Sequence, residues 1–400
     1  MSLTSKRLAF FLAAALLCAP TARALIIYGT GPTDVNNALN TTAPANGAPW
    51  ANVAQFGVNN ASGVYLGNGF ILTANHVTVV DSGIVINGVS YNRDTSFAPL
   101  QISEAPDSVD LKLVKIIGLP PLPVVQSLPL NFSTSSDLNA NCTLIGWGVG
   151  KGAIIANQGW YWGDDSTHAE RWGSNHTLSS AVAAAYPGYS YEALETPFSR
   201  SCQITLGDSG SGLFQKPGTV WKLSGITTSV LRYLDGAAQY DGRPTDPLDP
   251  LDPTTFGDQP DAANFVRLSK YAHLLRYENW ASAKLGSATA VATADADKDS
   301  SSNLLEYAFH TNPNSASASS FPQLGLEPGF VTLTYTKLLS ATDLSYVVEQ
   351  SPDASTGSWT PATVTEETVA TSGLTATIKA KVAVTTETKK FLRLSVTRLP

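Results

Sequence analysis

The chain has 400 residues, with 25 Lys and Arg against 32 Asp and Glu, which gives a formal net charge of −7 at pH 7. This length predicts two or three domains. An acidic chain binds poorly to nucleic acid and to anionic membrane surfaces, so the composition argues against both kinds of partner.

Residues 1–24 have the three parts of a secretory signal peptide. Lys6 and Arg7 form a basic start, residues 8–18 an apolar run, and Ala22-Arg23-Ala24 a cleavage site. The run is too short to span a bilayer, and no second long apolar stretch follows it. We therefore expect a secreted protein, extracellular or periplasmic, with no membrane span after the signal is removed.

Short apolar or alternating runs, separated by Gly, Asn, Pro and Ser, continue from Leu25 to about Val230. Such regularly spaced strands predict an antiparallel barrel or sandwich. Helical periodicity appears at 268–285, and the Pro- and Asp-rich stretch 241–261 is typical of an exposed loop.

The end of the chain is expected to form a separate unit. Residues 286–294 have the Ala, Thr, Ser and Gly composition of a linker, and strands return after residue 320. We expect a small β-sandwich over 320–400 with Tyr346, Trp359 and Phe391 in its core. Its expected role is binding to a surface or partner, stability or export.

A serine between glycines stands out at Gly207-Asp208-Ser209-Gly210-Ser211-Gly212. Glycine lets the backbone bend so that two N–H groups and the serine hydroxyl face one point, as acyl transfer requires. Alone, such a stretch is more often a plain turn. Two further segments strengthen it, because His76 follows the apolar strand 69–74 and Asp110 begins the alternating strand 110–115.

The ordered motifs resemble those of the chymotrypsin-like (trypsin-like) serine proteases over roughly residues 25–280. The resemblance rests on Leu72-Thr73-Ala74-Asn75-His76, Asp110-Leu111-Lys112-Leu113, Cys142 with Gly146-Trp147-Gly148, Gly207-Asp208-Ser209-Gly210, and Leu223-Ser224-Gly225-Ile226-Thr227-Thr228. It implies an all-β fold of two six-stranded β-barrels with the site between them, followed by a C-terminal helix.

The resemblance also implies a role for each site residue. Ser209 would be the nucleophile, His76 the general base and then acid, and Asp110 the group that orients the imidazole. The N–H groups of Gly207 and Ser209 would form the oxyanion hole. No cofactor is expected for this chemistry.

Some positions depart from the family pattern. Val77 replaces the cysteine that usually follows the histidine, and Ser211 and Gly212 replace Gly-Pro. In the family, Asp208 would pair with a newly formed N-terminal amine. The segment 26–29 resembles the family's mature start, so we expect activation without a long propeptide, although whether an amine at Leu25 or Ile26 reaches Asp208 is left open.

The base of the specificity pocket has two candidate residues. Counting back from Ser209 without gaps gives Gln203, whereas an insertion at 204–206 gives Arg200. Neither is acidic, so cleavage after Lys or Arg is not expected. Thr228 and Val230 would border the pocket, and Val230 in place of glycine would favour small side chains.

Two cysteines, Cys142 and Cys202, remain after signal removal. An exported protein can form a disulfide, but the sequence does not decide whether these two residues approach each other. In the family the partner of Cys142 would fall near Gln215, so a Cys142–Cys202 bond would be a non-family pairing.

Residues 295–306 have the ligand spacing of a calcium loop. The oxygen-bearing residues are Asp295, Asp297, Asp299, Ser301, Asn303 and Glu306. The segment resembles calcium-loop segments of secreted bacterial proteins, so we expect a structural calcium ion; the alternative is a solvated acidic linker within 284–319. Ser300 stands where the sharp turn favours glycine.

Together these patterns predict a secreted serine endopeptidase (peptidase domain 25–283) that acts on protein or peptide substrates. Two rivals remain from other classes: a catalytically inactive protease-fold binding protein and an esterase-like serine hydrolase. A purely structural surface protein is disfavoured by the ordered motifs.

Overall fold

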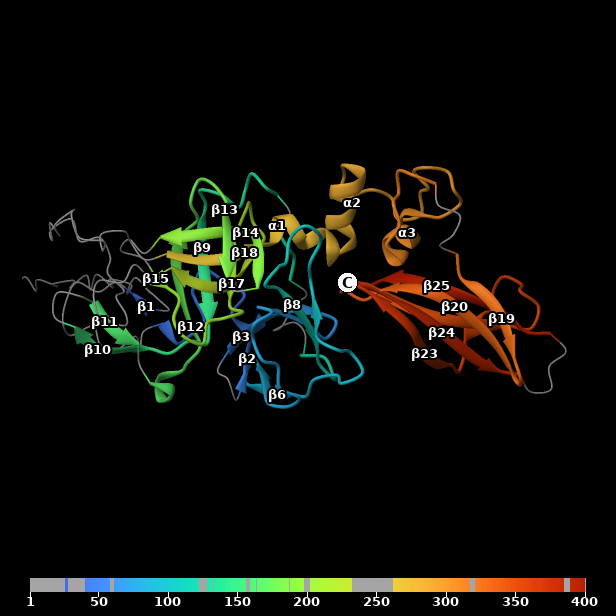
Figure 1. Ribbon diagram of the computed structural model, residues 1–400, viewed down its shortest axis with the longest axis horizontal. Helices are drawn as coiled ribbons and strands as arrows, with labels where there is room; N and C mark the ends of the chain where they lie inside the picture. Colours follow the sequence, from blue (N-terminus) through green and yellow to red (C-terminus); the bar gives the residue numbers. More distant parts are fainter. Residues whose placement is uncertain are drawn as a thin grey trace, which may run out of the picture.

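The structure is a computed structural model of the full chain. It describes residues 26–27, 40–57, 61–121, 128–131, 133–155, 159–162, 164–186, 188–197, 202–231, 262–316, 321–384 and 389–399. The predicted signal peptide, the loop 241–261 and Arg200 lie outside the described residues. Figure 1 shows an elongated molecule, with two β bodies, a short helical region and a β module in succession along its long axis.

The first β body is a seven-stranded antiparallel sheet in the order β6-β5-β2-β3-β4-β8-β7. Its strands are β2 (Val53–Phe56), β3 (Ala61–Gly67), β4 (Phe70–Thr73), β5 (Ile84–Ile86), β6 (Val89–Tyr91), β7 (Leu100–Gln101) and β8 (Lys112–Lys115). Strands β3 and β4 are buried along their whole length because they lie at the centre of the sheet, and β4 leads directly toward His76.

The second β body is another seven-stranded sheet, in the order β12-β9-β16-β17-β18-β14-β13. Its strands are β9 (Asn141–Gly146), β12 (Arg171–His176), β13 (Val182–Tyr186), β14 (Tyr189–Pro197), β16 (Gly212–Gln215), β17 (Lys222–Leu231) and β18 (Ala262–Arg267). Two small antiparallel strand pairs accompany it, β1 (Ile26–Ile27) with β15 (Cys202–Gln203) and β10 (Lys151–Ile155) with β11 (Gly159–Trp162).

The predicted helix at 268–285 is broken into three pieces. They are α1 (Leu268–Tyr271), the 3-10 turn η5 (Ala272–Leu274) and α2 (Tyr277–Leu285), and a further helix, α3 (Asn303–Phe309), follows. None of the helices in the described ranges is long and apolar enough to cross a membrane.

The C-terminal module contains a four-stranded sheet, β19-β20-β24-β23, and a three-stranded sheet, β22-β21-β25. The strands are β19 (Gln323–Glu327), β20 (Phe330–Leu338), β21 (Leu344–Ser351), β22 (Thr360–Pro361), β23 (Thr365–Ser372), β24 (Thr375–Ala383) and β25 (Phe391–Arg398). Residues of both sheets share one apolar cluster, as in a sandwich.

One predicted core aromatic of this module is wrong. The Phe391 side chain is 40% exposed because it begins edge strand β25, on the outside of the sandwich. Tyr335, which is buried, stacks on the partly buried Tyr346 with ring centroids 6.4 Å apart. Trp359 is partly buried under the guanidinium of Arg393, 4.4 Å from its ring centroid.

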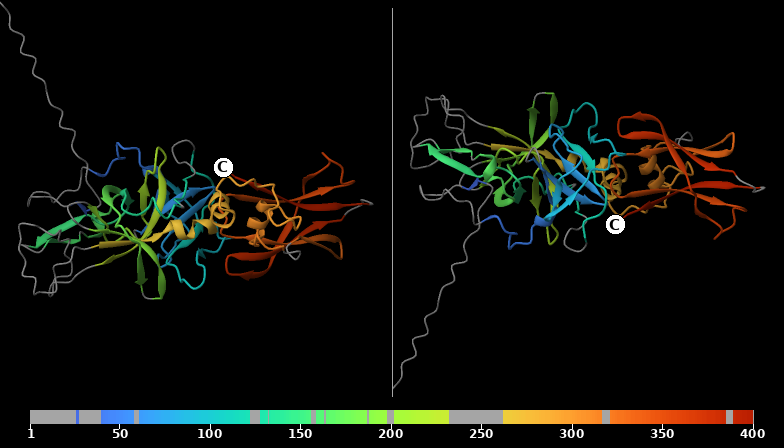
Figure 2. Two further views of the ribbon diagram at one scale, coloured as in Figure 1. Left: turned by 90° about the horizontal axis from the view of Figure 1, so that it is seen from above. Right: turned by 90° about the horizontal axis from the view of Figure 1, so that it is seen from below.

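The predicted all-β fold class is confirmed: the chain is mostly β, with two antiparallel β bodies and a C-terminal β module, although the main sheet of each β body has seven strands rather than six. The views in Figure 2 place the module at one end of the molecule, beyond the helices. One continuous apolar core nevertheless joins these parts, since it includes Leu268, Trp280 and Tyr307 as well as Leu338 and Leu344 of the module.

Candidate active site and candidate metal site

His76, Asp110 and Ser209 lie together although they come from three separate segments. The Nε2 atom of His76 is 2.9 Å from Ser209 Oγ, and its Nδ1 atom is 2.7 Å from Asp110 Oδ2. His76 follows β4, Asp110 precedes β8, and these two strands pair side by side. Ser209 comes from the second body, in the loop between β15 and β16.

Asp110 fixes the histidine through two contacts. Its Oδ1 atom accepts the backbone N–H of His76 at 2.9 Å, while Oδ2 faces Nδ1 of the ring. The carboxylate is fully buried, whereas the His76 ring is partly exposed. An ionised Asp110 only accepts hydrogen bonds, so it holds the proton on Nδ1 and leaves the Nε2 lone pair facing Ser209.

The Ser209 loop is held by Ser62, a residue that sequence reasoning missed. Ser62 N–H donates to Ser209 O at 2.8 Å, and Ser62 Oγ donates to Gly207 O at 3.2 Å. Ser62 lies within buried β3 and belongs to no motif, so nothing in the sequence signals it. Gly210 has a φ of +85°, and a Cβ there would stand 2.1 Å from Ser62 O. A side chain at this position would therefore push the two β bodies apart.

Gly207 and Ser209 retain unused backbone donors. Gly207 has a φ of +90°, and neither its N–H nor that of Ser209 donates a hydrogen bond within the described part of the chain. Their neighbours Asp208, Gly210 and Ser211 all donate to backbone carbonyls. An oxyanion hole needs backbone amides of this kind, which lie beside a serine hydroxyl and donate to none of the described residues.

The Asp208 carboxylate is buried and receives backbone hydrogen bonds. Gly148 N–H donates to Oδ1 and Thr205 N–H donates to Oδ2, both at 2.8 Å. Burial raises the pKa of Asp208 to about 6, while these amides act in the opposite direction. Leu25 lies outside the described residues, so the pairing of Asp208 with an N-terminal amine stays a prediction.

The predicted pocket residues occupy three different environments. Gln203 is buried on β15, where its Oε1 accepts the N–H of Ile204. Thr228 is buried and receives the hydroxyl hydrogen of Tyr191 at 2.7 Å. Val230 packs at the edge of an apolar cluster in the second body. Their role in specificity stays a prediction.

A cross-body contact beside the histidine also escaped sequence reasoning. Asn75 Nδ2 donates to the hydroxyl of Tyr189 at 2.9 Å, and Ser108 and Ser190 exchange two backbone hydrogen bonds. Both contacts join a segment of the first β body to strand β14 of the second. They hold the segments next to His76 and Asp110 against the second body.

Cys142 and Cys202 are both free thiols in the structure, buried in the same apolar cluster. Burial raises the pKa of each thiol well above its usual range. A thiol of high pKa is a poor nucleophile, so neither cysteine is a candidate nucleophile.

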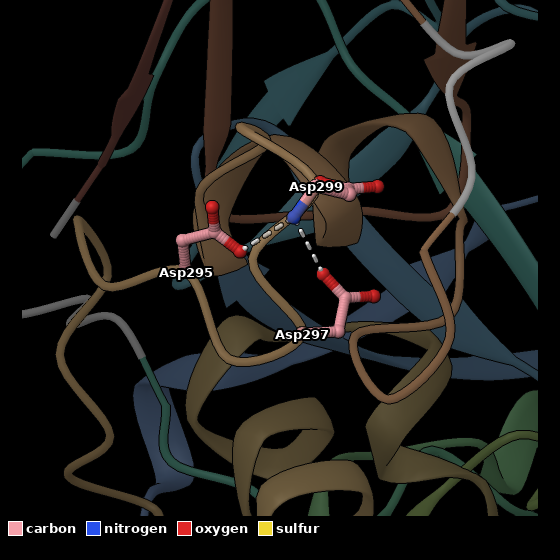
Figure 3. Close-up of side chains that lie close together, drawn as sticks. All are labelled: Asp295, Asp297 and Asp299. Atoms are coloured by element: carbon pink, nitrogen blue, oxygen red, sulfur yellow. Dashed lines mark hydrogen bonds between the residues drawn. The ribbon is translucent and has the colours of Figure 1, made fainter.

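The acidic loop brings together the first three of its predicted ligands. Carboxylate oxygens of Asp295, Asp297 and Asp299 lie within 4.8 Å of one another. The Asp299 N–H donates to Asp295 at 3.2 Å and to Asp297 at 3.3 Å, which folds the loop around the carboxylates (Figure 3). Ser300 has a φ of +75°, the left-handed conformation expected at this turn.

The remaining predicted ligands offer buried oxygens without protein partners. Ser301, Asn303 and Glu306 are 0%, 3% and 0% exposed, and Ser301 Oγ, Asn303 Oδ1 and both Glu306 carboxylate oxygens receive no hydrogen bond from the part of the chain that the structure describes. Burial, followed by the charges of the three aspartates, raises the pKa of Glu306 to about 7. Buried oxygens without partners, in the same segment as a cluster of carboxylates, fit a hard divalent cation.

No family model and no curated protein matches the chain. Among solved structures, the NS6 protease from murine norovirus 1 aligns with 14% identity and a TM-score of 0.30, over 56% of this chain and 93% of that one. A mutant of human heparin-binding protein aligns with 15% identity and a TM-score of 0.37, over 62% of this chain and 96% of that one. At these scores the likenesses add nothing to the geometry described above.

Proposed function

We propose that the chain is a secreted serine endopeptidase that cleaves peptide bonds through a Ser-His-Asp triad. The main support is that His76 contacts both other residues, with Nδ1 2.7 Å from Asp110 Oδ2 and Nε2 2.9 Å from Ser209 Oγ. Distances of this size allow proton transfer between the serine and the imidazole. The two unused amides of Gly207 and Ser209 support the same reaction.

In this mechanism, Ser209 Oγ attacks the substrate carbonyl carbon while its proton passes to His76 Nε2. The carbonyl oxygen becomes an oxyanion, which the N–H groups of Gly207 and Ser209 stabilise. The protonated histidine then gives its proton to the leaving amine, and the C–N bond breaks to give an acyl-enzyme. His76 then takes a proton from water, which attacks the ester carbon; the C–O bond to Ser209 breaks, the carboxylic acid leaves, and His76 returns the proton to Ser209 Oγ.

A fluorophosphonate probe tests the nucleophile. The mature protein should become labelled on Ser209, and Ser209→Ala and His76→Ala should both abolish labelling. Labelling that persists in Ser209→Ala would refute the assignment. An unlabelled but folded wild-type protein would favour the inactive binding protein, whereas turnover of esters but not of peptides would favour the esterase.

We also propose that the loop 295–306 binds a structural calcium ion through its six oxygen-bearing residues. The orphaned oxygens of Ser301, Asn303 and Glu306 support it. Calorimetric titration of metal-free protein should show one calcium site, lost in Glu306→Gln. Equal binding by the variant would place the ion elsewhere. Binding of a surface or partner by the module stays a prediction.

A further inference from the structure

The helices that end the peptidase domain have no side-chain N-caps, although Gly286 caps the C-terminus of α2. Arg276, the residue before α2, makes no side-chain cap, and neither does Tyr271 before η5. A helix terminus without partners leaves backbone N–H and C=O groups unsatisfied. Because this segment is buried, its terminal groups need partners from elsewhere in the protein.

Residues 340–342 of the C-terminal module satisfy the carbonyl groups. Ser340 Oγ donates to the carbonyl oxygen of Leu274 at 2.6 Å. Thr342 donates to the carbonyl oxygen of Leu275 through its N–H at 2.9 Å and its hydroxyl at 3.0 Å. Both side chains are fully buried, so the module closes the end of η5.

Asp343 joins the two flanking helices. Its Oδ2 atom accepts the N–H of Tyr277, the first residue of α2, at 2.9 Å, and its Oδ1 atom accepts the hydroxyl of Tyr307 from α3 at 3.2 Å. The Tyr307 ring also packs on Tyr277 and Trp280, with centroids 5.8 and 5.6 Å apart. A negative charge at the N-terminus of α2 is favourable.

The same α3 carries two of the proposed calcium ligands. Asn303 and Glu306 lie in its first turn, and Asn303 Oδ1 and both Glu306 carboxylate oxygens are buried without a hydrogen-bond partner among the described residues. Without a cation, these oxygens and the three aspartates repel one another, which opposes the folded loop and the placement of α3. With a cation, α3 is held where Tyr307 meets Asp343.

The module also contacts the first β body. Asn68 Nδ2 donates to the carbonyl oxygen of Thr342 at 3.0 Å. Asn68 lies in the turn between β3 and β4, and β4 leads to His76. The module therefore touches both the terminal helices and the hairpin that carries the proposed general base.

We infer that the C-terminal module stabilises the peptidase domain of the same chain, and that the cation of loop 295–306 holds the module in place. Residues 340–343 cap the terminal helices, and α3 transmits cation binding to α2. The inference rests on the proposed calcium site but not on peptidase activity.

Hydrogen exchange of the full-length mature Ser209→Ala variant tests it, since this variant cannot digest itself. Adding calcium should slow exchange about tenfold in 274–285 and in 66–73, as well as in the loop, and raise the unfolding midpoint by about 3–5 °C. Glu306→Gln should lose these effects. Glu367→Gln, a carboxylate on β23 that is 54% exposed, is the matched control and should keep them.

If calcium slowed hydrogen exchange only in 295–310, the proposed stabilisation by the module would be refuted while the calcium site would stand. No calcium effect on exchange anywhere would overturn both. Asp343→Ala gives an arm that does not depend on the metal, because it removes both acceptor oxygens and should speed exchange at 277–285 even with calcium present. Unchanged exchange there would show that Asp343 does not cap α2, whatever the result of fluorophosphonate labelling.

Discussion

The substitution Asp110→Asn changes one atom of the buried carboxylate and leaves its volume nearly unchanged. The side-chain oxygen must stay where it accepts the backbone N–H of His76 at 2.9 Å. The new NH₂ group therefore faces Nδ1, where Oδ2 stood at 2.7 Å. An NH₂ group can only donate, so Nδ1 must accept and the ring proton moves to Nε2, which then cannot take the proton of Ser209.

The loss of activity can be estimated from the hydrogen bonds that His76 would lose if it kept its proton on Nδ1 in the variant. Losing a hydrogen bond to a charged group costs about 3 kcal/mol, and leaving a buried donor unpaired costs about 2 kcal/mol more. A total of about 5 kcal/mol corresponds to a loss of about 10⁴-fold in kcat, the size known for this change in Ser-His-Asp triads. Because substrate does not contact Asp110 in this mechanism, KM should change little.

Steady-state hydrolysis of a peptide substrate measures the loss, and the unfolding midpoint confirms that the variant is folded. Asp81→Asn, a carboxylate of the same β body that is 68% exposed, is the control for charge and should keep full activity. A folded Asp110→Asn variant that retains more than about a tenth of the kcat would refute the assigned tautomer.

Three further changes test the site and the loop. Because burial raises the pKa of Asp208 to about 6, above its unfolded value near 3.9, the folded state prefers the protonated acid; stability should fall as pH rises from 4 to 6, by about 3 kcal/mol, and denaturant unfolding of Ser209→Ala should lose this slope when Asp208→Asn is added. Gly210→Ala should abolish labelling and lower stability by several kcal/mol because its Cβ meets backbone at 2.1 Å, whereas Gly218→Ala, with a φ of +79° but open space, should cost only about 1 kcal/mol; equal effects would show that the clash does not matter. Ser300→Gly should relieve the left-handed strain and raise the unfolding midpoint in calcium, by about 1 kcal/mol of stability, and a lower midpoint would contradict the turn assigned to this residue.

The three residues of the proposed triad could be singled out in the sequence because the proposed chemistry restricts the residue types. His76 and Asp110 are 34 residues apart, and His76 and Ser209 are 133 apart. Each lies at or near the end of a strand, where the backbone is free to turn toward the site. Ser62 could not be found in this way, because in the sequence a strand serine that holds another loop looks the same as a strand serine without such a role.

The break in the predicted helix has a tertiary cause. Residues 275 and 276 are leucine and arginine, which both favour helix, and neither glycine nor proline marks the break. The Leu275 carbonyl is instead taken by Thr342, and the N–H of Tyr277 by Asp343. Contacts from residues about 65 positions away override the local preference, so periodicity alone predicts one helix.

The Ala, Thr, Ser and Gly composition of 286–294 predicted a linker, but this segment packs against the core for a related reason. Small side chains are typical of flexible segments, but they also permit close packing. Ala290 and Ala292 lie against the shared core, and the Ala290 carbonyl accepts the hydroxyl of Tyr277. A composition that fits both a solvated linker and a tight junction cannot distinguish them, because the difference lies in partners that come from α2 and α3. The sequence alone therefore makes the C-terminal module look like an appendage, whereas its buried contacts with α2 make it part of the same folded unit as the two β bodies.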